Sequence, residues 1–426
     1  MAASSRTDIP WDLLITNFTF VKSNSDRNHV TDFSPCGEPN QGRDLNNFVE
    51  VLSKIIPEAA THKRIQYAKR YEAAAPDEIV ISVEDALKIA PHLRRHHSHC
   101  EVDGRYMTDE GPVSVALCNH VGDTRCRCAL RYEERRMSTF LHPYIQSGCH
   151  SFDLHNRRSF LGLEILKALL IYGDMETVLR ICAHPEVDFL QWWGAQECPC
   201  TAADLGWDML CREALRNFLG LGFIQGFAER RAQEHPDKGP EDFRLTRTYQ
   251  QMVLRSTTSG VRSEIKGYRY KQFYGIGDGQ FGLFPKPREL RRWCRNPGHF
   301  NYVLVLGRVP YDEFLVVERE LPYLPSAQEV ADVRSAVATK GRLPAELVDM
   351  VMGHGTHEET RALTVPHDPF HQQNQEQLEG FLGDCWQLLL RCDMFARALG
   401  DKVPWDLLID KIIVLLFSRT MSGRKR

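Results

Sequence analysis

The clearest alternation of apolar and polar positions lies in residues 112–134. Apolar residues recur with a period of two on both sides of Gly122-Asp123, at Val113, Val115, Leu117 and Val121 before it and at Cys126, Cys128 and Leu130 after it. Such a pattern around a two-residue turn that contains glycine is typical of a β-hairpin. We therefore predict a hairpin over 112–134, with Cys126 and Cys128 on its apolar face.

Most of the remaining chain shows helical spacing. Residues 160–172 are apolar nearly all round, residues 174–183 follow after Gly173, and apolar residues recur at helical spacing from Trp207 to Phe218. These patterns predict a buried helix, a second helix directly behind it, and a third after a polar break.

The strongest helical pattern stands near the C-terminus. Asn374 with Gln377 three residues later predicts a capping box, and Gly400 stands where a C-terminal cap belongs. Apolar residues from Leu378 to Leu399 alternate spacings of four and three. This seam is predicted to pack against the apolar residues of 409–416 as core.

The fold class that follows is mixed α/β and helix-rich, with the hairpin near 112–134 and a helical C-terminal bundle. Short strands are predicted near 268–274, 302–306 and 314–317. Residues 234–240 are polar and contain two prolines and a glycine, which makes them the best domain boundary. We predict a mainly helical region with a hairpin at 1–235, and a basic, strand-containing region followed by the helical bundle at 236–426.

The N-terminal residues 1–35 mix polar and aromatic groups, and we expect them to lie extended over the surface. The hexapeptide Pro-Trp-Asp-Leu-Leu-Ile occurs twice, at 10–15 and at 404–409. No further similarity extends the match, so we interpret it as chance and not as an internal repeat.

Composition narrows the protein class. Of the 426 residues, 42% are apolar and 26% are charged, which excludes a disordered or collagen-like chain. The longest apolar run near the end, 412–417, is far shorter than the roughly 20 residues of a membrane span. The 13 cysteines are odd in number and spread along the chain, unlike a secreted disulfide framework. We expect a cytoplasmic protein without a membrane partner.

Charge is nearly balanced overall, at −3, but it is unevenly distributed. Residues 244–295 hold 12 Lys and Arg against 3 acidic residues, and aromatic residues are interleaved among them. Basic side chains with aromatics suit a phosphate backbone and exposed bases. The candidate tRNA- or anion-binding residues are Arg262, Lys266, Arg269, Lys271, Lys286, Arg288, Arg291 and Arg292. The alternative is a basic face paired with the protein's own acidic surface.

An acidic stretch, 311–320, follows directly. If 314–317 is a strand, Asp312, Glu318 and Glu320 share one of its faces. Carboxylates beside a basic aromatic groove could hold a guanidinium group or act as general acid and base. These three are the candidate catalytic residues. The alternative is an edge strand with solvated ends.

Two further motifs have simpler readings. Gly277, Gly279 and Gly282 match Gly-x-Gly-x-x-Gly, a candidate phosphate loop, but no helix opens directly after it, as a dinucleotide fold requires. Cysteines and histidines gather between His92 and Cys128. Because Cys118 and His120 point to the face opposite Cys126 and Cys128, we expect no bound metal. No cofactor is predicted, and the set His367-Asp368-Pro369-Phe370-His371 is interpreted as a rigid loop.

Two resemblances add to this picture. Residues 342–352, Arg-Leu-Pro-Ala-Glu-Leu-Val-Asp-Met-Val-Met, resemble the opening of an F-box, the motif that docks adaptors onto ubiquitin ligases. The later part of that motif does not continue, because Gly353-His354-Gly355-Thr356 follows. The C-terminal third resembles a widespread family of uncharacterised proteins of filamentous fungi. The matching segments are 300–304, 318–325, 365–371 and 385–389.

Among fungal families of this size, the chain is weakly similar to the arginine-containing cyclodipeptide synthases. That resemblance implies an enzyme that uses aminoacyl-tRNA to join arginine to a second amino acid. The family's Asp-Asp-x-x-Glu motif is missing, since the chain contains no Asp-Asp pair.

The leading hypothesis is therefore a tRNA-dependent, amide-forming aminoacyl transferase of secondary metabolism, with aminoacyl-tRNA as partner. The rivals are an F-box-like protein-interaction adaptor, with a partner bound through the C-terminal helices, and a nucleotide- or phosphate-binding protein.

Overall fold

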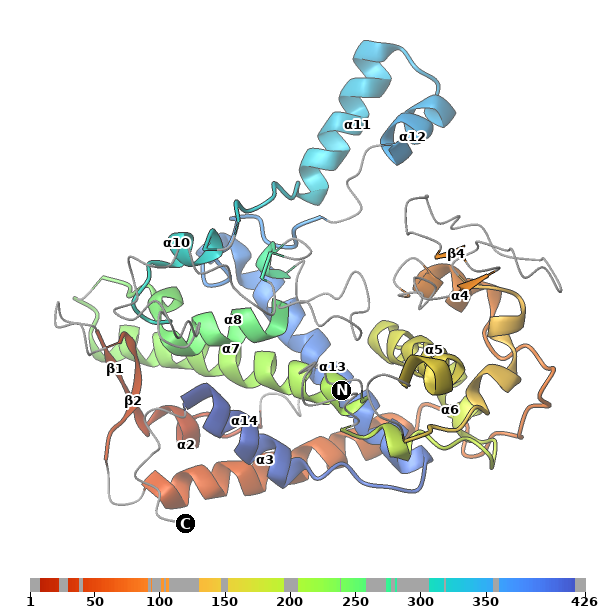
Figure 1. Ribbon diagram of the computed structural model, residues 1–426. Coiled ribbons are helices and arrows are strands. Elements are labelled where there is room, and N and C mark those ends of the chain that lie inside the picture. The colour runs from red at the N-terminus through yellow and green to blue at the C-terminus, as the bar shows by residue number, and fades with distance from the viewer. Residues whose placement is uncertain are drawn as a thin grey trace.

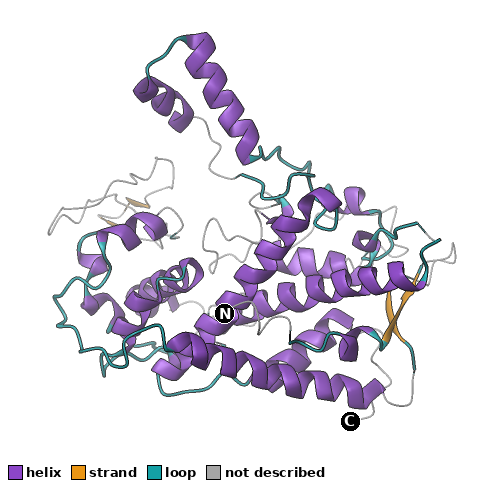
Figure 2. Cartoon of the chain, turned by 180° about the vertical axis from the view of Figure 1, so that it is seen from behind, coloured by secondary structure: helices purple, strands orange, loops and turns teal. Residues whose placement is uncertain are grey.

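The computed structural model describes residues 8–22, 30–37, 41–90, 93, 101–102, 105–106, 130–146, 152–194, 206–237, 239–257, 273–276, 280–281, 306–317, 319–354 and 360–417. Helices dominate these residues, as the sequence predicts, and long helices end the chain (Figures 1 and 2). The predicted hairpin strands of 112–129 lie outside the described residues, and 130–134 contain no strand. None of the described helices is both long and apolar enough to cross a membrane.

Four helices form the main body. They are α3 (Gln41–Arg64), α7 (Asp208–Glu234), α13 (Gln375–Ala398) and α14 (Trp405–Phe417). Helix α13 packs on α7 and α3, and α14 packs on α3, α7 and α8 (Arg247–Thr257). The seam of α13 therefore faces α7 and α3. The prediction that it packs mainly against residues 409–416, now in α14, is wrong. Gly400 ends the α13 region at φ +80°, as a C-terminal cap requires.

The N-terminal segment is built into this body, contrary to the expectation of an extended surface strand. Helix α2 (Asp12–Ile15) is followed by an antiparallel pair, β1 (Phe18–Val21) and β2 (Asp32–Pro35). Phe18 and Phe33 are buried, and both ring planes meet Phe223 of α7 edge-on. These buried aromatic side chains stabilise the segment against α7. The polar residues beside them along the chain gave no sign of this packing.

The repeated hexapeptide has the same structural role at both positions. Each copy starts a helix, α2 or α14, and both helices contact α3 and α7. In both copies the second leucine and the isoleucine are buried while the aspartate is exposed in the first turn. An acidic residue at a helix N-terminus is favoured by the helix dipole. Each copy therefore begins a helix and packs the start of that helix on α3 and α7.

A second group of helices lies beside the body (Figure 1): α4 (Val83–Ile89), α5 (Phe152–Tyr172) and α6 (Met175–Cys182). The predicted helices 160–172 and 174–183 are confirmed. Helix α5 carries a fully buried ion pair, with 2.9 Å between the Lys167 ammonium and the Glu164 carboxylate. A two-residue ladder, β3 (Glu101–Val102) with β4 (Arg105–Tyr106), belongs to this side.

Two predicted strands are wrong where the structure describes them. Residues 311–315 form the short helix α10 (Tyr311–Leu315), with buried Tyr311, Phe314 and Leu315. Pro310 precedes the helix, where its fixed φ suits a first turn. At the end of the predicted strand 268–274, Phe273 and Tyr274 are helical. Strand 302–306 is described only at Leu306.

The loop before α13 differs from the predicted capping box. The Asn374 side chain makes no cap hydrogen bond. Its amide nitrogen instead donates to the carbonyls of Val365 (2.8 Å) and Asp368 (2.6 Å), and its oxygen accepts from the Val365 amide (2.9 Å). Asn374 thus holds loop 365–371 in one shape, in keeping with the predicted rigid loop.

Helices α11 (Ala327–Gly341) and α12 (Ala345–His354) form a hairpin that projects from the body in both views (Figures 1 and 2). We call this helical hairpin the arm. The predicted boundary near 235/236 falls at the end of α7, and helices from both sides of it, α7 and α13, pack together. The division into two domains remains a prediction.

Candidate functional site

At the described residues 314–317, the structure does not show the strand on which the predicted acidic site was based. Asp312 is an exposed residue of the short helix α10, and Glu320 is exposed in the segment that follows. Glu318 lies outside the described residues. These three residues would share one face only in a strand, where side chains alternate with a period of two, and Asp312 lies in a helix. A catalytic role for these residues remains a hypothesis without that support.

The predicted anion site cannot be located. All eight basic candidates, from Arg262 to Arg292, and the glycines 277, 279 and 282 lie outside the described residues. Two arginines at the start of the basic stretch are described. The Arg244 guanidinium pairs with Asp242, 2.8 Å from Nε to the carboxylate, and Arg247 is buried. Both are held within the protein's own fold.

A polar cluster surrounds loop 365–371. His367 has a left-handed backbone (φ +59°), and its Nδ1 lies 3.0 Å from the Tyr274 carbonyl. The Arg244 guanidinium donates to the His367 carbonyl and lies over the Tyr311 ring. Desolvation lowers the pKa of His367, the hydrogen bond to the Tyr274 carbonyl partly offsets this, and the nearby Arg361 and Arg244 lower the pKa further. The side chain is therefore neutral at physiological pH.

Histidine, tyrosine and arginine together are typical of proton-transfer sites, but this cluster is closed. Tyr249, Tyr274 and Tyr311 are fully enclosed, and burial raises the pKa of each phenol. The Tyr274 hydroxyl donates to the Asn217 side chain at 2.6 Å. Neither of the two cavities described below is lined by these groups. The cluster fastens loop 365–371 to α7 and α8.

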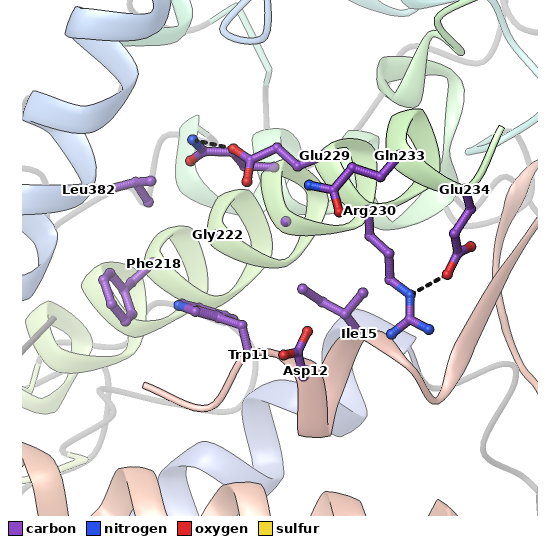
Figure 3. Close-up of a pocket in the computed structure, with 12 residues that line it drawn as sticks. Trp11, Asp12, Ile15, Phe218, Gly222, Glu229, Arg230, Gln233, Glu234 and Leu382 are labelled. Atoms are coloured by element: carbon purple, nitrogen blue, oxygen red, sulfur yellow. Dashed lines mark hydrogen bonds and ion pairs between the residues drawn. The ribbon is translucent and has the colours of Figure 1, made fainter. Parts of the chain in front are cut away.

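A groove with a volume of about 580 Å³ runs along α7 between α2 and α13 (Figure 3). Gly222 and Gly226 let α2 approach closely, since a Cβ at Gly222 would lie 2.7 Å from Trp11 Cη2. The Trp11 ring packs between Phe48 and Phe218, with ring centroids 5.9 and 5.7 Å away. Sequence reasoning missed this groove, because the hexapeptide carrying Trp11 was interpreted as chance.

The second hexapeptide lines a second cavity, of about 1070 Å³, between α3, α13 and α14. The Trp405 indole donates to the Asp393 carboxylate at 2.8 Å, and Arg397 pairs with the same carboxylate at 2.8 Å. The Arg397 guanidinium also donates to Thr61 and to the Pro57 carbonyl. These contacts of Trp405, Asp393 and Arg397 link α13 to α3 and α14.

The arm presents an apolar surface. Helix α11 has no buried residue. On α12, Leu347, Met350 and Val351 are 43%, 59% and 48% exposed, and their spacing of three and four puts them on one helix face. Val348 on the same helix is 2% exposed, and α12 contacts α11. We call Leu347, Met350 and Val351 the arm face. They fall within the segment that resembles an F-box opening.

The base of the arm is firmly built. Ser326 and Glu329 form a capping box at the start of α11, and backbone contacts join Ser326 and Pro325 to Arg361. The Arg361 guanidinium lies 3.1 Å from the Glu329 carboxylate. The backbone hydrogen bond from Ser326, together with hydrogen bonds from Tyr323 and the Ser326 side chain, lowers the pKa of Glu329 to about 2. These contacts join the two ends of the arm to each other at its base.

Among the described residues, no three His, Cys, Asp or Glu side chains gather in a way that could hold a metal ion. The predicted absence of zinc at Cys118–Cys128 is not tested, because those residues are not described.

Comparison with known proteins gives a family. A family model described as "Gramillins biosynthetic cluster protein GRA5" matches residues 12–423. The chain belongs to this family. The match begins at Asp12, within the first hexapeptide, and spans the described helices of the body, the arm and the second hexapeptide, so family membership concerns nearly the whole fold. The family fits the predicted fungal lineage and secondary metabolism. Neither a curated protein nor a solved structure matches the chain.

Proposed function

We propose that the chain works in natural-product biosynthesis as a protein-interaction component, docking a partner protein through the arm face. The observation that carries this proposal is the exposed stripe of Leu347, Met350 and Val351 on a helix that projects from the body. Anchors at i, i+3 and i+4 on one helix are the usual way a short amphipathic helix enters a partner's groove.

The charges of α12 define the partner further. The helix contains Glu346 and Asp349 but no lysine or arginine, and Asp349 pairs with Arg334 of α11. Glu346 is left for a partner, which would offer an apolar groove with a basic group on its rim. Exposed apolar side chains that cluster on a surface mark interaction sites, whereas single exposed apolar side chains are common on any protein.

The test substitutes the arm face in a fungus that carries the gene and measures the cluster's product by mass spectrometry. The double variant Leu347→Ser, Met350→Ser should abolish most of the product, while protein abundance and unfolding temperature stay unchanged. The matched control is Leu87→Ser on α4, a leucine with 48% exposure that lies away from the arm. Product at the parental level in the arm variant would reject the proposal.

The tRNA-dependent amide synthesis expected from the sequence is the second candidate, supported by the excess of basic residues in 244–295. It predicts tRNA binding whose affinity falls steeply with salt, with about one unit of slope for each phosphate contact. Reversing Arg291 and Arg292 to Glu should weaken retention of bulk tRNA on a filter. Unchanged retention would remove this candidate.

A further inference from the structure

One lysine of the body, Lys63, is held without an acidic partner. It stands in the last turn of α3 and is half-buried. Its side-chain nitrogen donates to the side-chain oxygen of Gln387 on α13, which is a neutral group. In the part of the chain that the structure describes, no ion pair joins Lys63 to a carboxylate, and the charge that acts on it is the guanidinium of Arg391.

The Arg391 guanidinium is anchored at the end of α5. It donates to the carbonyls of Leu170 (3.1 Å) and Ile171 (2.8 Å), and a cation is favoured at a helix C-terminus. Gly173, at φ +86°, lets the following turn close on it, since an added Cβ would lie 2.7 Å from Nη2. The second positive charge is therefore fixed beside Lys63.

The nearest acidic side chain of this junction is engaged elsewhere. The charges of Glu176 and Arg391 both act on Tyr67, which places them at the same junction. The Tyr71 hydroxyl donates to the Glu176 carboxylate at 2.8 Å. Burial, together with this hydrogen bond, raises the pKa of Tyr71 to about 12, so the hydroxyl stays protonated and keeps donating to Glu176.

These surroundings favour the uncharged form of the lysine. Desolvation, and then the charge of Arg391, lower the pKa of Lys63 to about 8. At pH 7 about one such side chain in ten is a neutral amine, against roughly one in 2,500 for an ordinary lysine with a pKa of about 10.4. Desolvation and a neighbouring cation are the two means by which proteins activate a lysine as a nucleophile.

We propose that Lys63 is a nucleophilic amine that forms an imine with a small aldehyde or ketone. The nitrogen lone pair attacks the carbonyl carbon and forms a C–N bond. The carbonyl oxygen leaves as water with the two hydrogens of the amine, so the step needs neither an oxidant nor a reductant. Lys63 lies in the body and not on the arm, so this inference goes beyond the proposed function and can fail without it.

The experiment exposes the purified full chain to propionaldehyde and cyanoborohydride at pH 7. Hydride reduces the imine to a stable propylamine, and peptide mass spectrometry follows each lysine with time. The reference is Lys54 on the same helix, which is exposed and pairs with Glu50 at 2.6 Å. We expect Lys63 to be alkylated at least about fivefold faster than Lys54, because its larger neutral fraction outweighs its lower basicity and access.

A matched pair of variants tests the surroundings of the amine. Gln387→Glu keeps the shape of the side chain but gives Lys63 a carboxylate partner, which favours the ammonium form and should slow its alkylation about tenfold. Gln375→Glu makes the same change at the exposed first residue of α13, three turns away, and should leave the rate unchanged. Alkylation of Lys63 no faster than that of Lys54 in the parent chain would overturn the proposal. So would an unchanged rate in folded Gln387→Glu.

Discussion

At the scale of single residues, small side chains on α7 decide where the neighbouring helix start can lie. Gly222 faces the Trp11 ring, and Gly226 faces Ile15, with an added Cβ only 2.7 and 2.5 Å from those side chains. A glycine in a helix interior costs roughly 1 kcal/mol relative to alanine. The close approach of α2, which buries Ile15 and shapes the groove, offsets that cost.

A matched pair of substitutions tests this role of Gly222. Gly222→Ala should lower the free energy of unfolding by about 1–2 kcal/mol, because overpacking against Trp11 exceeds the gain in helix propensity. Gly380→Ala on α13, where an added Cβ meets nothing within 4 Å, should raise it by up to about 1 kcal/mol. Urea unfolding measures both. Stabilisation by both substitutions would show that Trp11 can move away freely.

His367 gives a second prediction, on pH. Burial lowers its pKa in the folded chain, so the unfolded chain, with a pKa of about 6.5, binds the proton more readily. Stability should therefore fall as the pH is lowered through about 6.5, by at most about 1.4 kcal/mol per pH unit from this group, until the folded pKa is reached.

The variant His367→Asn isolates that contribution, because asparagine tolerates the left-handed backbone at φ +59°. Between pH 7 and 5 it should lose less stability than the parent chain. A comparison at pH 8, where the histidine is neutral in both states, gives the offset of the substitution itself. Parallel stability curves for the two proteins would contradict this assignment.

At the scale of elements, long apolar periodicity was predictable and short elements were not. The helices over 160–172, 174–183 and 378–399 follow from spacing alone, since each buries a continuous face. Within the acidic stretch 311–320, the sequence predicts a strand over 314–317 with Asp312, Glu318 and Glu320 on one of its faces. In the structure Tyr311, Phe314 and Leu315 are buried together, a spacing of three and four that equally fits one helical turn.

The candidate surfaces also could not be predicted fully from local sequence patterns. The F-box resemblance directed attention to 342–352, where the arm face lies. The exposure of Leu347, Met350 and Val351 depends on the direction of the arm, which no local pattern contains. The groove depends on the meeting of α2, α7 and α13, which are more than 140 positions apart in sequence. The sequence pattern indicates that Asn374 caps α13. In the structure its side chain instead forms hydrogen bonds with loop 365–371, which precedes the helix.

The arm should fold as an element coupled weakly to the body. Ser326→Ala removes the capping oxygen that accepts from the Glu329 amide at 3.2 Å, and should cost α11 about 0.5–2 kcal/mol. Amide hydrogen exchange should accelerate in α11 while the global unfolding temperature stays unchanged. Ser335→Ala, at an exposed mid-helix position, should slow exchange slightly because alanine favours the helix. Faster exchange throughout α7 or α13 would contradict this independence.

At the scale of the whole molecule, the body and the arm have different surfaces. The body buries one continuous core from Ile9 to Phe417, whereas α11 contributes no buried residue to it. The family match at 12–423 includes both parts. We interpret the body as the scaffold that carries the arm and the arm face as the surface that engages the partner.

The most direct test of this account is removal of the arm. Ser326 and Arg361 already lie side by side at its base, so a short glycine-serine linker can replace 327–360 without separating body elements. The account predicts a protein with the parental unfolding temperature that no longer supports formation of the cluster's product in a fungus carrying the gene. Product at the parental level from this folded, armless protein would contradict the account.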